Sequence, residues 1–149
     1  MQMKKEHRDG ALKELPWSPV VLPLQYFRLG ELAIIGFPGE ITTEAGRQLR
    51  DLCAEILKEA GIRYVVISTY ANSYFGYCTT FEEYQLQLYE GGHTVFGSRT
   101  HDAFRTEFKN MLSECLKPKK DRKFERNPKP KVFSDKEITL RTINSKRRS

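Results

Sequence analysis

The sequence predicts an α/β fold: a layered mixed sheet with flanking helices. Three short apolar runs, at 24–29, 32–37 and 64–68, have the length of buried strands. A segment with helical spacing, 43–60, separates the second run from the third, and this strand-helix-strand order is typical of layered α/β domains. Apolar residues make up 39% of the 149 residues, which suits one modest domain with a core.

The first two runs predict a β-hairpin. Residues 16–23 contain three prolines and favour an extended conformation over a helix. The runs at 24–29 and 32–37 follow, and only the Gly30-Glu31 pair separates them, as in a hairpin. The Pro38-Gly39 pair is expected to end the second strand.

A long helix is predicted over 43–60, before the strand at 64–68. Thr42 or Thr43 is placed to cap its start, and Gly61 is placed to end it. Its apolar residues recur at three- and four-residue spacing: Ala45, Leu49, Leu52, Cys53, Ile56 and Leu57.

A tyrosine-rich stretch, residues 70–92, follows the third strand. Thr80 and Glu83 have the spacing of a capping box, which predicts a short helix from about Phe81 to Gly91. A last helix is predicted from about 100 to 116, with apolar residues on one side: Phe104, Phe108, Met111, Leu112 and Cys115.

The positive charge of the chain lies in its last part. Residues 118–149 hold 12 of the 25 Lys and Arg but 4 of the 19 Asp and Glu, a net charge of +8, whereas residues 1–117 carry −2. This part is interpreted as a solvated linker or tail, because acidic residues interrupt the basic ones. Binding to anionic lipid head groups or to nucleic acid phosphates stays open as an alternative.

Other classes of protein are excluded or left open by simple patterns. No run of about 18 apolar residues occurs, so no membrane span is predicted, and the start does not read as a secretory signal. Cys53, Cys78 and Cys115 lack the spacing of a zinc site or a disulfide framework, and are interpreted as small apolar thiols.

Several motifs occur together in one order. They are Pro38-Gly39-Glu40, Thr42-Thr43, Ala45-Gly46-Arg47, Thr79-Thr80-Phe81-Glu82-Glu83-Tyr84 and Tyr89-Glu90-Gly91. With these motifs the chain resembles the neutral ceramidase family, zinc-dependent amidases that hydrolyse the N-acyl bond of ceramide. The resemblance runs from about Pro16 to Leu116, and implies the C-terminal portion of a larger catalytic domain. Cys78 and the stretch at 97–100 depart from the family pattern.

The resemblance also implies a zinc site to which this chain contributes two ligands. In the family two histidines, a glutamate and a tyrosine hold the metal; the glutamate corresponds to Glu40 and the tyrosine to Tyr77. A second tyrosine, implied in binding the substrate carbonyl oxygen, corresponds to Tyr89. The two histidine ligands are expected from upstream sequence absent in this chain. They do not correspond to His7, His93 or His101.

The residues themselves permit both roles and plainer ones. An acid before a helix, such as Glu40, also stabilises the first turn by about 0.3–1 kcal/mol, and a tyrosine-rich loop also serves for packing. A phenol, with a pKa of about 10, is expected to bind metal only when the cation stabilises the phenolate. A histidine beside a helix start, such as His101, is interpreted as a surface or capping group.

The predicted division is a weakly matched segment at 1–15, the ceramidase-like part at 16–117, and the basic linker at 118–149, leading towards an absent β-sandwich. The predicted function is zinc-dependent hydrolysis of ceramide to sphingosine and fatty acid, with this chain supplying part of the active site. The alternative is an inactive fragment or a regulatory module with a basic tail. Expected partners are ceramide, the upstream segment and a membrane surface, whereas nucleic acid is not favoured. The family is typically secreted or membrane-associated, but the location of this chain is left open.

Overall fold

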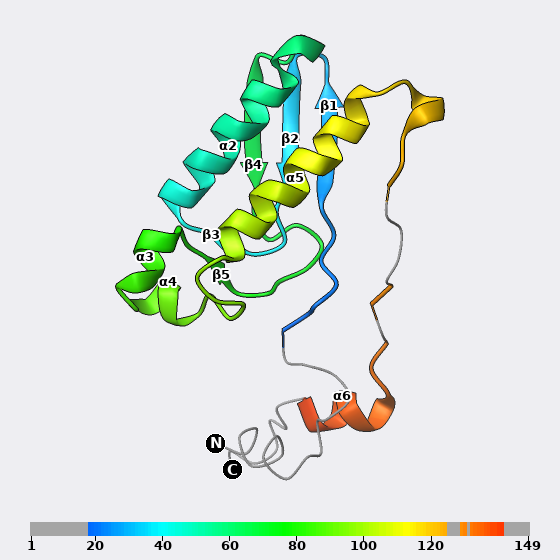
Figure 1. The fold of residues 1–149 in the computed structure, drawn as a ribbon. Coiled ribbons are helices and arrows are strands. Elements are labelled where there is room, and N and C mark those ends of the chain that lie inside the picture. The colour runs from blue at the N-terminus through cyan, green and yellow to red at the C-terminus, as the bar shows by residue number, and fades with distance from the viewer. Residues whose placement is uncertain (1–17, 125–128, 131, 142–149) are drawn as a thin grey trace.

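A three-stranded mixed sheet forms the centre of the molecule (Figure 1). The structure is a computed structural model that describes residues 18–124, 129–130 and 132–141. Strands β1 (Gln25–Leu29) and β2 (Leu32–Gly36) form an antiparallel hairpin, and β4 (Tyr64–Ser68) lies parallel to β2. The mixed sheet and the hairpin predicted from the sequence are therefore confirmed.

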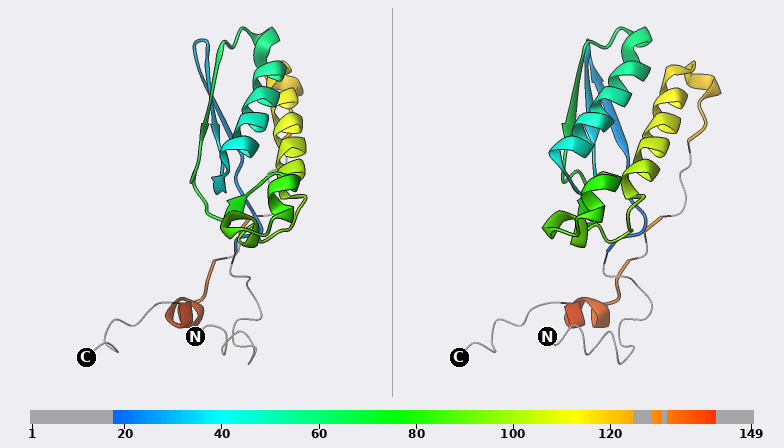
Figure 2. Two further views of the ribbon diagram at one scale, coloured as in Figure 1. Left: turned by 90° about the vertical axis from the view of Figure 1, so that its left-hand side faces the viewer. Right: turned by 60° about the vertical axis from the view of Figure 1, so that its left-hand side comes forward.

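Two long helices cover one face of this sheet. Helix α2 (Thr43–Leu57) lies in the connection between β2 and β4, and a 3₁₀ turn at Lys58–Ala60 extends it. The Thr42 hydroxyl caps α2 by accepting a hydrogen bond from the Ala45 N–H at 3.4 Å. Helix α5 (Thr100–Leu116) packs beside α2 on the same side of the sheet (Figure 2).

The core lies between these helices and the sheet. The predicted helix faces are buried there, with Leu49 and Cys53 from α2 and Phe108 and Leu112 from α5 fully enclosed. Phe37, just after β2, packs in the centre of this layer. Its ring lies 5.9, 4.7 and 6.4 Å, between centroids, from the rings of Phe75, Phe104 and Phe108.

A second, two-stranded sheet was not predicted. Strands β3 (Glu40–Ile41) and β5 (Tyr77–Cys78) pair in parallel below the main sheet. Beyond β5, two short helices, α3 (Phe81–Gln85) and α4 (Tyr89–Gly92), replace the single short helix that the spacing predicts. The capping box of Thr80 and Glu83 at the start of α3 is confirmed.

The basic tail contains two short helical segments. A 3₁₀ turn (Lys119–Asp121) follows α5, and α6 (Asp135–Arg141) lies in a region predicted to be a linker. The predicted segment 1–15 lies outside the described residues. Every helix in the described part of the chain is too short or too polar to cross a bilayer.

Candidate functional site

The turn that carries Glu40 is held by the loop at 69–76. After β2 the chain turns at Pro38 and Gly39, and three successive carbonyls accept hydrogen bonds from this loop. The Ala71 N–H donates to Phe37 O at 2.9 Å, the Phe75 N–H to Pro38 O at 3.2 Å and the Tyr70 N–H to Gly39 O at 3.2 Å. The position of Glu40 is therefore fixed by backbone bonds to a segment more than thirty residues away in the chain.

Two glycines allow this close approach. A Cβ at Gly39 would lie 2.6 Å from the Phe75 ring and 2.7 Å from Gly76 O, which no side chain tolerates. Gly76 has a φ of +109°, and a Cβ there would lie 2.9 Å from His93 O. The Pro-Gly-Glu motif therefore requires its glycine for steric reasons.

The pairing of β3 with β5 brings the predicted metal ligands together. In the parallel register Glu40 lies opposite Tyr77, and the Glu40 N–H donates to Gly76 O at 2.9 Å. The ring of Tyr89, from α4, meets the Tyr77 ring edge-on, with 5.5 Å between centroids. The three residues that the resemblance singles out thus gather at one end of the molecule.

Two further tyrosines belong to this cluster and were missed from the sequence. The Tyr74 hydroxyl donates to Glu40 Oε1 at 2.6 Å, and the Tyr70 ring stacks on the Tyr74 ring at 6.0 Å with 2° between planes. Tyr70 and Asn72 both have positive φ, 57° and 58°, which non-glycine residues rarely adopt. The abundance of tyrosine in the loop was the available signal, but it did not indicate which hydroxyl faces Glu40.

Hydrogen bonding sets the charge of this cluster. Interaction with the hydroxyls of Tyr74, then Tyr77 and Tyr70, lowers the pKa of the Glu40 carboxyl. The same carboxylate raises the pKa of Tyr74 to about 12 and also raises the pKa of Tyr77. At neutral pH the cluster is therefore one ionised carboxylate surrounded by neutral phenols.

Glu83 ties the two helix starts next to the site. Its Oε2 accepts hydrogen bonds from the Thr80 N–H at 2.8 Å and from the Thr42 hydroxyl at 2.6 Å. Because Thr42 caps α2 and Thr80 caps α3, one carboxylate joins both caps. The site thus has a second fixed support in addition to the β3–β5 pairing.

One histidine, His101, is buried where the sequence predicted an exposed side chain. His101 is buried, 2% exposed, and its Nε2 lies 3.0 Å from Ala45 O, so its interpretation as a surface or capping group is wrong. It joins α5 to α2, and burial lowers its pKa. His93 is exposed; its carbonyl accepts the Tyr77 N–H at 3.2 Å and its ring lies 5.8 Å from the Tyr77 ring. His93 therefore supports Tyr77.

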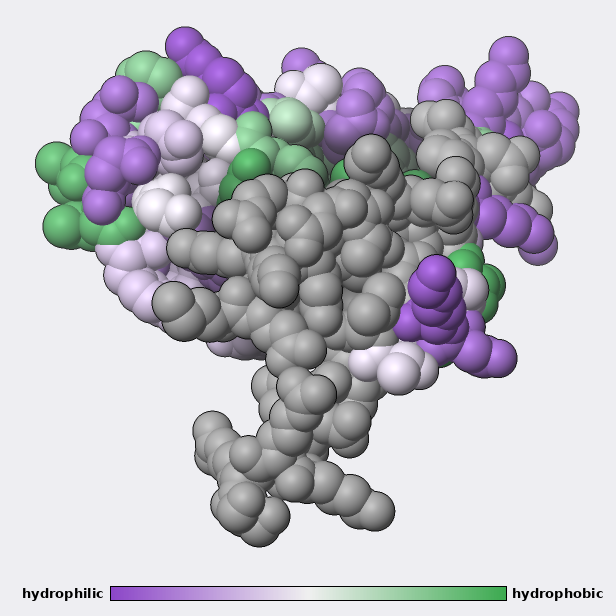
Figure 3. Space-filling model, turned by 90° about the horizontal axis from the view of Figure 1, so that it is seen from below, coloured by the Kyte–Doolittle hydropathy of each residue, from purple (hydrophilic) through white to green (hydrophobic). Residues whose placement is uncertain are grey.

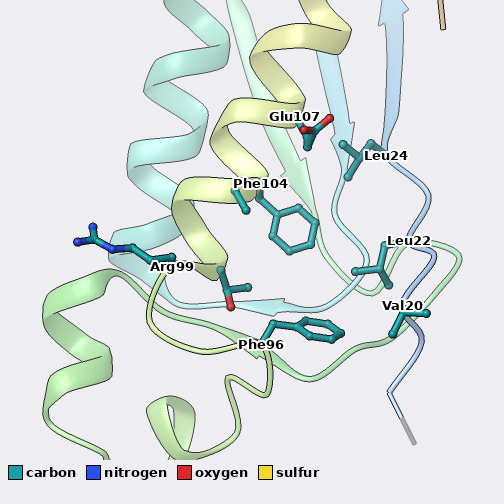
Figure 4. A pocket seen from close by; sticks show the side chains of 9 residues that line it. Val20, Leu22, Leu24, Phe96, Arg99, Phe104 and Glu107 are labelled. Carbon is teal, nitrogen blue, oxygen red and sulfur yellow. The ribbon is translucent and has the colours of Figure 1, made fainter. Parts of the chain in front are cut away.

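Two cavities flank this end of the molecule. One, of 510 Å³, has Tyr77, Thr42 and Glu83 among its lining residues. The other, of 480 Å³, is apolar on most sides, with Phe104, Leu22 and Leu24 facing it from α5 and from the segment before β1 (Figure 4). Seen from below, groups of hydrophobic and hydrophilic residues lie side by side on the described surface (Figure 3).

The donor set fits part of a zinc site. Among the described residues no three His, Cys, Asp or Glu side chains form a group that could hold a metal ion. Glu40 and Tyr77 offer two oxygen donors of suitable chemistry, whereas a catalytic zinc takes three protein ligands and an open position. These residues fit zinc only if further ligands come from outside the described part of the chain.

Comparison with known proteins identifies close relatives. The chain is 46% identical over 102 residues to the neutral ceramidase of Pseudomonas aeruginosa, covering 68% of this chain and 15% of that protein. It is 42% identical over 137 residues to neutral ceramidase 3 of Arabidopsis thaliana, covering 89% of this chain and 18% of the relative. The chain therefore spans less than a fifth of the length of these relatives.

Solved structures agree with this relationship. A ceramidase complexed with C2 and the neutral ceramidase from Pseudomonas aeruginosa each match with a TM-score of 0.68 at 45% identity, over 69% of this chain and 16% of theirs.

A family model, described as neutral/alkaline non-lysosomal ceramidase, N-terminal, matches residues 8–106. The comparison supports an N-terminal region of these proteins, whereas the sequence predicted a C-terminal portion of the catalytic domain. By this match, the chain belongs to the neutral/alkaline non-lysosomal ceramidase family.

Proposed function

We propose that this chain supplies part of the active site of a zinc-dependent amidase that hydrolyses ceramide to sphingosine and a fatty acid. Glu40 and Tyr77 are two of the metal ligands, and Tyr89 binds the carbonyl oxygen of the scissile amide. Two histidine ligands come from ceramidase sequence outside this chain. The observation that carries the proposal is the parallel β3–β5 pairing, which sets Glu40 opposite Tyr77.

We propose that residues 16–117 form the ceramidase-like part of the chain and that 118–149 follow it as a basic linker. The family match stops at residue 106, whereas the match to the Arabidopsis relative covers 89% of the 149 residues. That share does not fit within the first 106 residues, so the similarity to the relative continues beyond residue 106.

Each residue of the cluster has a distinct role in the proposed reaction. Bound zinc supplies the Lewis acidity that makes water a nucleophile near neutral pH. Glu40 offers an ionised carboxylate whose Oε1 is already oriented by the Tyr74 hydroxyl. The phenol of Tyr77 keeps its proton until a cation is bound, because Glu40 raises its pKa.

In this proposal Tyr89 acts on the substrate rather than on the metal. Its side chain is 75% exposed beside Tyr77, so its hydroxyl is accessible to an incoming amide. A donor at this position stabilises the negative charge that develops on the carbonyl oxygen during attack.

The neighbouring apolar cavity suits a hydrocarbon tail of the substrate. Phe75, in the tyrosine-rich loop, packs at a tilt against Phe96 and stacks on Phe104, with centroids 5.7 and 5.1 Å apart. Phe96 and Phe104 line the cavity of Figure 4. The loop that carries the tyrosines of the site therefore also packs against the wall of an apolar space, as a lipid hydrolase requires.

The experiment that tests the proposal uses a chimaera. Residues 18–117 of this chain replace the matching region of the Pseudomonas neutral ceramidase, and bound zinc and hydrolysis of a fluorescent ceramide are measured. Glu40→Ala and Tyr77→Phe are expected to reduce zinc affinity by about tenfold or more, whereas Tyr89→Phe keeps the zinc and loses about 10²–10³ in turnover. Exposed Glu59→Ala, and Tyr84→Phe, serve as matched controls.

The outcomes separate the assigned roles. Unchanged zinc content in both Glu40→Ala and Tyr77→Phe removes the ligand assignment. Unchanged turnover in Tyr89→Phe removes its role at the carbonyl oxygen. If this chain alone hydrolyses ceramide with added zinc, no ligands from outside the chain are needed.

A further inference from the structure

Each of the two proposed metal ligands comes shortly before a helix start. Glu40 opens β3, and Thr42, two residues later, caps α2. Tyr77 opens β5, and Thr80, three residues later, caps α3. Because only two or three residues join each ligand to its cap, a change in the distance between the two caps moves the strands that carry the ligands.

One side chain joins the two caps. Glu83 Oε2 accepts hydrogen bonds from the Thr42 hydroxyl at 2.6 Å and from the Thr80 N–H at 2.8 Å. The Thr80 hydroxyl in turn accepts the Glu83 N–H at 3.2 Å, which completes the capping box of α3. A capping box ties a helix to its own first residues, whereas this carboxylate also reaches a residue 41 positions earlier in the chain. We call the two hydrogen bonds to Oε2 the Glu83 bridge.

The backbones next to these caps are held together by few other bonds. The Glu40 N–H donates to Gly76 O at 2.9 Å, and the Thr42 N–H donates to Cys78 O at 3.0 Å. Both bonds join the segment around β3 to the segment around β5, which pair in parallel over two residues each. In so short a pairing, a side-chain bridge between the same two segments contributes a large part of what holds them in register.

The helix that carries Glu83 also sets the position of Tyr89. Helix α4, which begins at Tyr89, packs on α3 (Figure 1). The contact is close at Gly91, where a Cβ would lie 3.3 Å from Tyr84 O and 3.4 Å from Glu83 O. The tyrosine proposed to bind the substrate carbonyl therefore rests on the helix whose start the Glu83 bridge fixes.

We propose that Glu83 is a positioning residue of the amidase site. Through the two helix caps, its carboxylate holds Glu40, Tyr77 and Tyr89 in one arrangement. Glu83 and Tyr77 line the same cavity of 510 Å³, so the bridge lies beside the ligands that it positions. This step rests on the proposed function, because the amidase assignment gives the three residues their shared task, whereas the bridge itself rests on the hydrogen bonds above.

The plainer explanation is a capping box that stabilises α3 alone. It accounts for the bond to the Thr80 N–H, but a capping box does not need the bond to the Thr42 hydroxyl. The two explanations differ in what the side chain must provide. Glu83→Gln keeps a carbonyl oxygen at the same reach, which is able to accept both hydrogen bonds. Glu83→Asp keeps the charge on a side chain that is one methylene shorter, so the two substitutions separate reach from charge.

The first measurement is hydrogen exchange in the full chain without metal. In Glu83→Ala the amides of Glu40 and Thr42 are expected to exchange at least about fivefold faster relative to the core amides of α5. Ile35→Val, which removes a methyl group from a fully buried side chain, is the control for general loss of stability and leaves this ratio unchanged. Glu83→Gln restores the native ratio, whereas Glu83→Asp does not.

The second measurement uses the chimaera with the Pseudomonas neutral ceramidase. Glu83→Ala is expected to lower zinc affinity and ceramide turnover by about tenfold each, because a small displacement of ligands and substrate-binding groups is costly. Glu83→Gln is expected to restore both values. Ile35→Val keeps both values although it lowers the melting temperature, so loss of stability alone does not produce the pattern. Should Glu83→Ala fail to accumulate, Thr42→Val removes the bridge from its other side, and Thr42→Ser, which keeps the hydroxyl, is its control.

Two results overturn the proposal. Native exchange of the Glu40 and Thr42 amides in Glu83→Ala shows that the bridge does not hold the strands. Faster exchange with native zinc affinity and turnover shows a capping box that has no bearing on the site. Failure of the proposed function is recognised separately, by unchanged zinc content in Glu40→Ala and Tyr77→Phe. In that event the exchange measurement still decides whether Glu83 holds β3 to β5.

Discussion

The two faces of the sheet carry similar apolar residues but differ in how far these residues are buried. Ala33 and Ile35 on one face are sealed under α2 and α5, whereas Phe27 and Val66 on the other are half exposed. Within β2 successive side chains alternate between the two faces, and the register aligns Ile34, the residue between Ala33 and Ile35, with Phe27 of β1 and Val66 of β4. Among the described residues, the covering helices therefore lie on one face of the sheet and not on the other.

The candidate site is divided in the same way. Glu40 and Tyr77 are brought together by bonds within the chain, from the β3–β5 ladder to the Tyr74 hydroxyl. Among the described residues around them, no three His, Cys, Asp or Glu side chains form a group that could hold a metal ion.

The largest expected effect on stability comes from replacing a phenylalanine by alanine, once in the buried core and once on the uncovered face of the sheet. Phe108→Ala removes a fully buried ring from α5 and is expected to cost about 3–5 kcal/mol of unfolding free energy in the isolated chain. Phe27→Ala, on the uncovered face of the sheet, is expected to cost about 0.5 kcal/mol or less. Urea unfolding followed by circular dichroism measures both. Equal losses of unfolding free energy would break the comparison, because they would show that Phe27 is already packed in the isolated chain.

Much of the covered half was predictable from the sequence, because its pattern is local. The hairpin, β4 and the long helices follow from apolar spacing, and Thr42 or Thr43 was already a candidate cap. Periodicity fails where an element is too short to have a period. β3 and β5 have two residues each, and their pairing depends on contacts between distant segments.

The same limit explains the errors at individual residues. The hydrogen bond from Tyr74 to Glu40 joins positions 34 apart, so no local pattern indicates it. His101 stands at a helix start, where a polar residue is ordinarily exposed, yet the neighbouring helix α2 covers it. Burial by a second element is a tertiary property that the sequence of the first element does not contain.

A medium effect is expected at Glu83, which holds the site end by hydrogen bonds rather than by apolar packing. Glu83→Ala leaves the Thr80 N–H and the Thr42 hydroxyl without their shared acceptor, and is expected to cost about 1–2 kcal/mol. Glu82→Ala, the adjacent exposed acid on α3, is the control. Chemical denaturation measures both variants. If Glu82→Ala lowers the unfolding free energy as much as Glu83→Ala does, the hydrogen bonds of Glu83 to the two helix caps do not account for the loss.

A smaller, pH-dependent effect is expected at His101 in the covered half. Burial lowers the pKa of His101 below its ordinary value of 6.5, so the unfolded chain binds the proton more readily. Its contribution to stability is therefore complete above pH 6.5 and is lost as the pH falls towards the folded pKa. Melting temperatures measured from pH 7.5 to 5 are expected to fall in the native chain. The fall should be weaker in His101→Gln, which keeps a donor near Ala45 O, and unchanged in exposed His93→Gln.

The smallest expected effect lies at the open end, where Tyr74 acts on Glu40 without contributing much to stability. Tyr74→Phe removes the hydroxyl that most lowers the pKa of Glu40, so that pKa is expected to rise towards its ordinary value of 4.5. The carboxyl ¹³C shift of Glu40, followed by NMR between pH 2 and 7, measures the change. Tyr70→Phe is expected to raise the pKa less, because its hydroxyl is a weaker partner than those of Tyr74 and Tyr77. An identical Glu40 titration in the native chain and in Tyr74→Phe would mean that the carboxylate is oriented by the β3–β5 backbone alone, and that this end of the molecule is preorganised by its fold and not by its tyrosines.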